Sequence, residues 1–184
     1  MSKYMLKTIS LILYLSLICV FFINCKSIIY KKNKTDFTVY NISDCPEDGT
    51  CFLEIIENKC VKIQKDEFDK SYIIFEENES TSVLKFNYKR NRVKGVADQG
   101  YQELIYLNIN NDMKEIALIG ESLSDVGVIF GRLCFCRENT GYFEVEDGNL
   151  KIKKLKKMGY KLDLSFKIKD IPQIISSISE TFYY

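Results

Sequence analysis

Hydrophobic and polar residues alternate with a period of two along much of the chain beyond residue 36. The same alternation recurs over Leu84–Tyr88 and Tyr142–Val145. In the clearest stretch, 160–168, the apolar members are Tyr160, Leu162, Leu164, Phe166 and Ile168. A period of two places alternate side chains on opposite faces of a strand, so we predict strands that each bury one face.

Turn-forming residues separate these stretches at regular intervals. The segment Glu146–Asn149 contains Asp-Gly, which predicts a tight hairpin turn. The expected strands are 51–56, 60–64, 72–76, 82–90, 101–109, 114–119, 126–136, 142–146, 150–155 and 160–168. Many short strands at this spacing indicate an all-β fold, either an antiparallel sandwich or a barrel-like meander.

The C-terminal segment fits two structures. Its apolar residues Ile171, Ile174, Ile175, Ile178 and Phe182 share one helical face, and Asp170 with Pro172 provides a helix start. The β-branched residues in 174–179 are equally compatible with a final strand. We expect a short C-terminal helix, with a last strand as the alternative.

The N-terminus has the pattern of an export signal. Lys3 and Lys7 precede an uncharged stretch, 8–23, and Asn24-Cys25 follows directly. This resembles the type II signal peptide of bacterial lipoproteins, with Phe22–Cys25 in the place of the lipobox and Asn24 where Gly, Ala or Ser is commonest. The resemblance implies that residues 1–24 are removed and that Cys25 carries the lipid. Residues 25–36 are polar and lysine-rich, so we expect a tether there, and the length of 37–184 is that of a single β-rich domain.

This resemblance also implies a subcellular location. A protein with several acyl chains on Cys25 would be held stably in a membrane. No acidic run follows Cys25, so we expect an anchor in the outer membrane with the domain facing the periplasm, as in small envelope lipoproteins of Gram-negative bacteria. The alternatives are an ordinary secreted protein, or an uncleaved helix with a cytoplasmic domain, which Lys26, Lys31 and Lys32 would favour.

Composition excludes several kinds of chemistry. The 184 residues include no histidine, so no Ser-His-Asp or Cys-His site and no histidine metal ligand can form. Without Lys3 and Lys7, 24 basic and 25 acidic residues remain, a net charge of −1 that does not favour nucleic acid as a partner. We therefore predict no cofactor and no metal site, and we lean towards a protein that is not an enzyme.

Five cysteines follow Cys25, and in an oxidising envelope disulfides are expected. The candidates are Cys45, Cys51, Cys134 and Cys136. A Cys45–Cys51 bridge would close a short loop and contribute about 2 kcal/mol. Cys134 and Cys136 lie two apart on an expected strand, so they should be out of bonding distance and bond elsewhere, for instance to Cys45 or Cys51. The alternative for these four is a thiolate metal site, and for Cys60 a redox-active thiol.

A polar loop, a lysine-rich stretch and an acidic turn are further candidates for binding sites. The loop 90–100 is a candidate binding edge. The lysines of 151–157 are expected on a solvated edge strand, with anionic lipid or polysaccharide as the alternative partner. Asp44, Glu47 and Asp48 are expected in a plain turn, with calcium as the alternative.

The function that follows is a lipid-anchored binding or scaffold module whose partner is an envelope protein or a glycan. Two alternatives remain. One is a carboxylate-based glycan hydrolase, which needs two acidic residues about 5–10 Å apart across a cleft. The other is a thiolate metal or redox protein.

Overall fold

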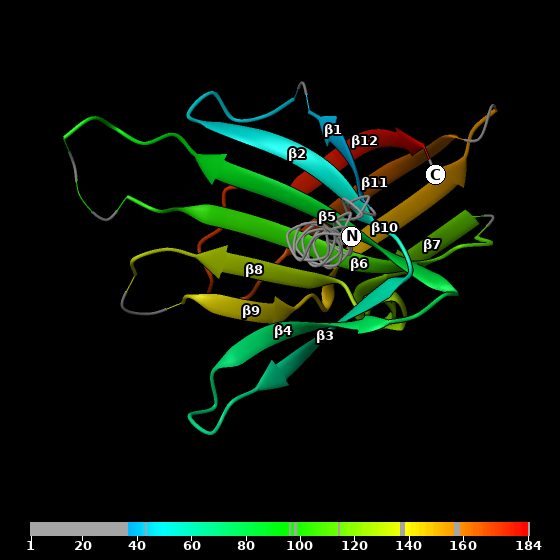
Figure 1. The fold of residues 1–184 in the computed structure, drawn as a ribbon, viewed down its shortest axis with the longest axis horizontal. Helices are drawn as coiled ribbons and strands as arrows, with labels where there is room; N and C mark the ends of the chain where they lie inside the picture. The colour runs from blue at the N-terminus through cyan, green and yellow to red at the C-terminus, as the bar shows by residue number, and fades with distance from the viewer. Residues whose placement is uncertain are drawn as a thin grey trace, which may run out of the picture. The chain divides into compact units, whose positions relative to one another are not determined.

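The computed structural model describes residues 37–42, 44–95, 97, 99–113, 115–136, 139–156 and 159–183, with side chains from Ile42 onward. These residues form antiparallel sheets and one short 3₁₀ helix (Figure 1). The predicted signal peptide, Cys25 and the tether lie outside the described residues. Within the described part, no helix has the length and apolar character needed to cross a bilayer.

Two sheets make up most of the domain. The large sheet has the order β1-β2-β5-β6-β8-β9, and the small sheet has the order β12-β11-β10-β7. The strands of the large sheet are β1 (Phe37–Asn41), β2 (Gly49–Ile56), β5 (Thr81–Arg90), β6 (Gln102–Asn110), β8 (Ile129–Leu133) and β9 (Gly141–Glu144). Those of the small sheet are β7 (Glu115–Ile119), β10 (Asp147–Lys154), β11 (Gly159–Lys167) and β12 (Ser177–Tyr183).

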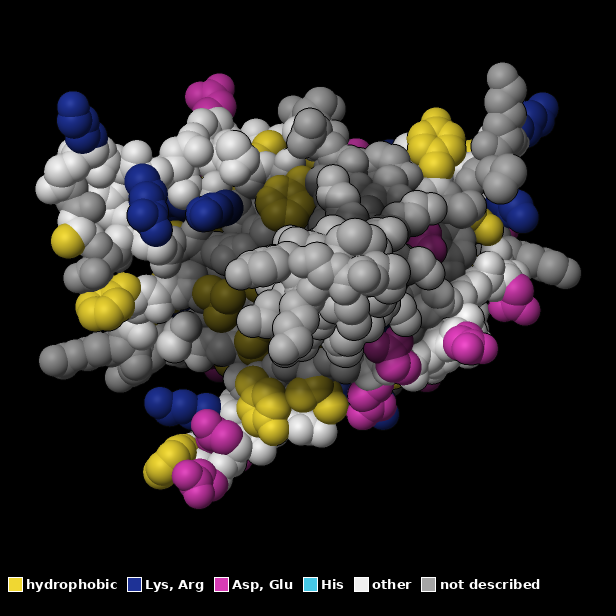
Figure 2. All heavy atoms as spheres, viewed as in Figure 1, with side chains coloured by type: hydrophobic (Ala, Val, Ile, Leu, Met, Phe, Trp, Pro, Cys, Tyr) yellow, Lys and Arg dark blue, Asp and Glu magenta, His cyan; other side chains and the backbone are white. Residues whose placement is uncertain are grey.

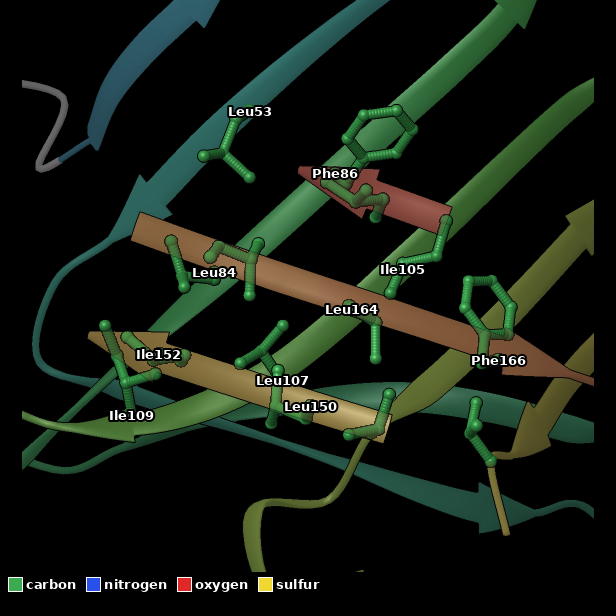
Figure 3. Packing of buried hydrophobic residues seen from close by; sticks show 14 of the residues in the cluster. Leu53, Leu84, Phe86, Ile105, Leu107, Ile109, Leu150, Ile152, Leu164 and Phe166 are labelled. Atoms are coloured by element: carbon green, nitrogen blue, oxygen red, sulfur yellow. The ribbon is translucent and has the colours of Figure 1, made fainter. Parts of the chain in front are cut away.

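The main core lies between these two sheets. Figure 3 shows Leu84, Ile105 and other apolar side chains of the large sheet facing Leu150, Leu164 and other residues of β10 and β11. The strands of the two sheets cross in this view. The inward residues alternate with outward polar ones along each strand, which is the arrangement of a sandwich. The expected all-β fold is confirmed, and none of the sheets closes into a barrel.

A hairpin covers part of the outer face of the large sheet. It consists of β3 (Lys59–Lys65) and β4 (Ser71–Glu77). Val61 packs there with Val83, Leu104 and Tyr106 in a second buried cluster. The ring of Phe75 meets that of Tyr106 edge-on, with centroids 6.0 Å apart. The large sheet is therefore buried on both faces over β6 and β8.

All ten strands expected from alternation are present, with ends displaced by a few residues. The expected strand 126–136 is shorter than predicted, because η1 (Gly120–Val126) precedes it and a bend follows Leu133. The strand β1 had not been predicted.

The prediction of a C-terminal helix is wrong. Residues 177–183 form β12, which pairs with β11 in the register Phe182↔Tyr160. Ile178 and Phe182 are buried, whereas Ser179 and Tyr183 are exposed. Ile178 and Phe182 are four residues apart, a spacing that suits one face of a helix and one face of a strand equally well. Pairing with the free side of β11 decides between the two.

The hairpin predicted at Glu146–Asn149 is also wrong. Asp147 begins β10, and the chain passes there from the large sheet to the small one. Gly148 pairs with Phe166, and a Cβ atom at Gly148 would lie 2.5 Å from the carbonyl oxygen of Ser165. Glycine is required here for a close approach of two strands, not for a turn.

The lysine-rich strand was expected to be an edge strand, and this prediction is wrong. β10 lies between β11 and β7, and its lysines Lys151 and Lys153 are exposed on the outer face of the small sheet, whereas Lys154 lies over the ring of Tyr160 at the end of the strand. Lys157 lies outside the described residues. The lysines are thus solvated, but they do not protect a sheet edge.

Two adjacent aromatic residues test the C-terminal strand. Phe182 is fully buried and stacks on Tyr160, whereas Tyr183 is 56% exposed. We predict that Phe182→Ala lowers the free energy of unfolding by about 3–5 kcal/mol. Tyr183→Ala, the matched control, should lower it by less than about 1 kcal/mol. Urea denaturation measures both, and equal effects would contradict the strand register.

Candidate functional site

Four connections meet at one end of the large sheet. β2 begins and β5 ends there because Gly49 pairs with Arg90, and β6 begins and β8 ends there because Gln102 pairs with Leu133. The hairpin turn joins this end because the Ser71 hydroxyl donates to the carbonyl oxygen of Tyr142 at 2.6 Å. We call the described residues of 42–48, 66–70, 91–101 and 134–140 the loop face; it lies on the left in Figure 1.

The first part of its base is a polar cluster formed by the residue before β2 and the end of β5. Asp48 accepts hydrogen bonds from the Tyr88 hydroxyl at 2.7 Å and from Arg90 Nε at 3.0 Å. The hydrogen bond from Tyr88 and the charge of Arg90 lower the pKa of Asp48. The amide of Asn91 donates to the carbonyl oxygen of Asp48 at 2.8 Å, so this residue joins the 42–48 and 91–101 loops.

Two arginines meet the ring of Tyr101. The guanidinium carbon of Arg90 lies 4.6 Å from the ring centroid, and that of Arg132 lies 5.4 Å away. Both distances are in the range of cation–π attraction. The Arg132 Nη1 also donates to the carbonyl oxygen of Asn139 at 2.9 Å. Tyr101 thereby connects the ends of β5 and β8 beneath the loops.

A buried carboxylate completes the base. Glu103 is fully buried on β6. Its oxygens accept hydrogen bonds from the amides of Ile174 and Ile175, each at 2.7 Å, and from the Tyr101 hydroxyl at 2.5 Å. Burial raises the pKa of Tyr101, which keeps its hydroxyl available as a donor. Glu103 therefore ties the segment before β12 to the large sheet.

Sequence reasoning missed Glu103, although a signal was available. In the alternating stretch 101–109, Glu103 occupies the same parity as Ile105, Leu107 and Ile109. A carboxylate at an inward position of a strand requires buried donors. The donors lie 71 and 72 residues further along the chain, so the sequence could indicate the need for them but not their identity.

Apolar side chains project from three of the four loops. The exposed fractions are 83% for Phe135, 73% for Phe68 and 65% for Val93. In Figure 2, separate hydrophobic side chains stand along the left side of the molecule, with Lys and Arg beside the upper ones and Asp and Glu beside the lowest. Loops held on a rigid scaffold often carry binding residues, so these three tips are candidates for contact with a partner.

The structure pairs the four candidate cysteines within each motif. Cys45 is bonded to Cys51, with Cα atoms 5.6 Å apart, which is the short-loop bridge considered from the sequence. Cys134 is bonded to Cys136, so the expectation that these two bond elsewhere is wrong. The prediction assumed a strand, in which Cα atoms two residues apart are about 6.6 Å apart. Here β8 ends at Leu133, and the bent chain brings the Cα atoms to 5.2 Å.

This pairing leaves no thiolates on these four residues for a metal. Among the described residues, Cys60 is the one free cysteine, and no group of three or more Cys, Asp or Glu side chains is placed to hold a metal ion. Asp48 is engaged by Tyr88 and Arg90, while Asp44 and Glu47 are exposed. Both disulfides lie on the loop face.

A cleft lies beside the hairpin and reaches the loop face at Asp69. Two adjoining pockets, of about 990 and 640 Å³, share Ile63, Glu121, Glu144 and Glu146 as lining residues. These three carboxylates are exposed. The acid of a glycosidase normally has its pKa raised by burial, so their exposure does not favour hydrolytic chemistry over a solvated surface.

No protein-family model, curated protein or solved structure matches this chain.

The charge of Asp48 makes the stability of the loop face depend on pH. A pKa that is lower in the folded protein gives a stabilisation that is present above the unfolded value of about 3.9 and is lost as the pH falls through the folded value. We predict that the wild type exceeds Asp48→Asn in urea midpoint by a constant amount from pH 7 to 5, and by less below pH 4. A difference that does not change between pH 5 and 3 would contradict this.

Glutamine cannot replace Glu103 without loss. Its amide nitrogen would face the amide of Ile174 or Ile175, because Gln offers one acceptor oxygen where the carboxylate offers two. We predict that Glu103→Gln lowers the free energy of unfolding by about 1–3 kcal/mol. The control is Glu144→Gln on the exposed cleft, with an effect within about 0.5 kcal/mol. Equal effects in urea denaturation would rule out a structural role for the Glu103 carboxylate.

Proposed function

We propose that this protein is a lipid-anchored protein of the bacterial envelope that binds a partner protein through its loop face. The observation that carries the proposal is the combination of a fixed base and exposed tips at one end of the sandwich. The base consists of Asp48, Arg90, Tyr101 and Glu103 with their partners. Loops on a rigid scaffold bind with less loss of conformational entropy than loops that must be ordered first.

The point at which the chain enters the domain supports a loop face that points away from the anchor. Phe37 pairs with Ile56, at the far end of β2 from Gly49. The chain thus enters the domain at the end opposite the loop face. A tether of residues 26–36 spans at most about 36–40 Å when extended. A domain held by lipid on Cys25 can therefore direct its loop face away from the membrane that carries the anchor.

The charges of the loop face favour a protein over a uniform polyanion as partner. The 91–101 loop is basic, with exposed Arg92 and Lys94, whereas the hairpin turn carries Asp66, Glu67 and Asp69. Mixed charges around apolar tips suit a complementary protein surface, in which apolar groups provide most of the affinity and charges the specificity. A glycan partner is the alternative, and nucleic acid is disfavoured.

The anchor is tested by labelling. We predict that cells fed labelled palmitate incorporate the label into the wild-type protein and that its mature N-terminus is Cys25. Cys25→Ser should abolish the label, whereas Cys60→Ser should retain it. A mature protein that starts elsewhere, or a label that survives Cys25→Ser, would refute the anchor.

The binding surface is tested by crosslinking in cells. A photoreactive phenylalanine analogue at position 135 should give an adduct of one defined mass. The same analogue at Ser165, on the exposed outer face of the small sheet, is the control and should not give it. Val93→Asp should reduce the adduct from position 135 several-fold, because it places a charge at a neighbouring apolar tip. An identical adduct from both positions would contradict the proposal.

A further inference from the structure

The two disulfides of the loop face differ in how the fold holds them. Cys51 is on β2, is 7% exposed and belongs to the main core, against which Cys45 packs. Cys134 and Cys136 are half-buried and belong to neither buried cluster, and Phe135 between them is 83% exposed. The second disulfide is therefore partly open to an approaching thiolate on both sides, whereas the first is shielded on the Cys51 side.

The two pairs also differ in what reduction would release. Hydrogen bonds from the amide of Ile42 to the oxygen of Cys51, and from Gly49 to Pro46, hold the Cys45–Cys51 loop closed independently of its disulfide. The sulfurs would stay close after reduction and re-form their bond. Cys134 and Cys136 follow the end of β8, and their Cα atoms are 5.2 Å apart, closer than the roughly 6.6 Å of an extended chain. Reduction lets this loop extend, so its two thiols are at a lower effective concentration.

We propose that Cys134–Cys136 is a redox-active disulfide that exchanges with thiols, small or protein-borne, while Cys45–Cys51 is structural. A thiolate attacks one sulfur of the pair, a mixed disulfide forms, the Cys134–Cys136 bond breaks, and the other cysteine leaves as a thiolate. A second thiolate attacks the reactant's sulfur in the mixed disulfide and releases the first cysteine. Two reactant thiols are thus oxidised to one disulfide, and Cys134 and Cys136 take up two electrons and two protons.

The surrounding structure tolerates this reaction. The hydrogen bonds at the base of the loop, from Arg132 Nη1 to Asn139 and from the Thr140 hydroxyl to the carbonyl oxygen of Arg132, do not involve either cysteine. Reduction changes the tip that presents Phe135 and leaves the sandwich intact. Disulfides that solvent reaches outside the core are the ones that take part in exchange.

Cys60 does not act as the second thiol. It pairs with Glu76 on the hairpin, five residues from Ser71 at the loop face, which is about 17 Å along the strand. The second thiol therefore comes from the reactant. This proposal does not depend on the lipid anchor or on a binding partner.

The experiment uses the full-length protein and glutathione as the probe. The protein is equilibrated in a series of reduced and oxidised glutathione mixtures, quenched with acid and alkylated, and each cysteine is quantified in its own peptide by mass spectrometry. We expect Cys134–Cys136 to be half reduced at a ratio of reduced to oxidised glutathione at least tenfold lower than Cys45–Cys51 requires. Cys60→Ser should give the same two midpoints.

A matched pair of double variants separates chemistry from folding. Replacing Cys134 and Cys136 by serine should leave the melting temperature within a few degrees of the wild type, whereas replacing Cys45 and Cys51 should lower it clearly. The proposal is overturned if Cys134–Cys136 becomes half reduced only at the glutathione ratio that Cys45–Cys51 requires. It is also overturned if Cys134 and Cys136 are reduced only when urea unfolds the chain, or if either is bonded to another cysteine.

Discussion

The burial of two apolar sheet faces against each other is the interaction on which the rest of this structure depends. Leu53, Leu84 and Ile105 on one sheet and Leu150 and Leu164 on the other are almost fully removed from water. Burial of such side chains contributes roughly 1.5–3 kcal/mol each. Neither sheet could remain ordered alone, because each would expose a continuous apolar surface. The pairing of β12 with β11 and the burial of Phe182 follow from the same requirement.

The polar base of the loop face depends on that core. Glu103 occupies an inward position on β6, where a carboxylate is tolerated only because three donors converge on it. Asp48 and Arg90 lie at strand ends fixed by the register of β2 and β5. The sandwich thus determines where the loops begin and end, while the tips, including Val93 and Phe135, remain exposed. A surface of this kind combines order at its base with apolar groups available for contact.

Alternation along the chain predicted ten of the twelve strands that the structure describes, because a half-buried strand imposes a period of two on its own sequence. It was insufficient where one pattern satisfied two structures, as at Ile178 and Phe182. It also failed where a residue serves a distant neighbour: Gly148 resembles a turn residue, but its role is to let the backbone of Ser165 approach.

The site was less predictable than the fold for a related reason. The loop 90–100 could be recognised as a candidate edge from its polar composition, yet Asp48 and Tyr88 are 40 residues apart, and Glu103 and Ile174 are 71 apart. Contacts of such sequence separation are set by strand order, which local patterns do not specify. The bend that joins Cys134 to Cys136 depended on where β8 ends, and strand ends are the least predictable feature of a sequence.

Native-state hydrogen exchange tests most directly whether the loop face has a base built into the core. The decisive amides are those of Ile174 and Ile175, which lie outside regular strands but donate to the buried Glu103 carboxylate. We expect these two amides to exchange with nearly the free energy of the core strands, whereas the amide of Phe135 exchanges by local opening at a much lower free energy. If the amides of Ile174 and Ile175 exchanged as readily as that of Phe135, the segment before β12 would not be anchored to the core and the loop face would have no fixed base.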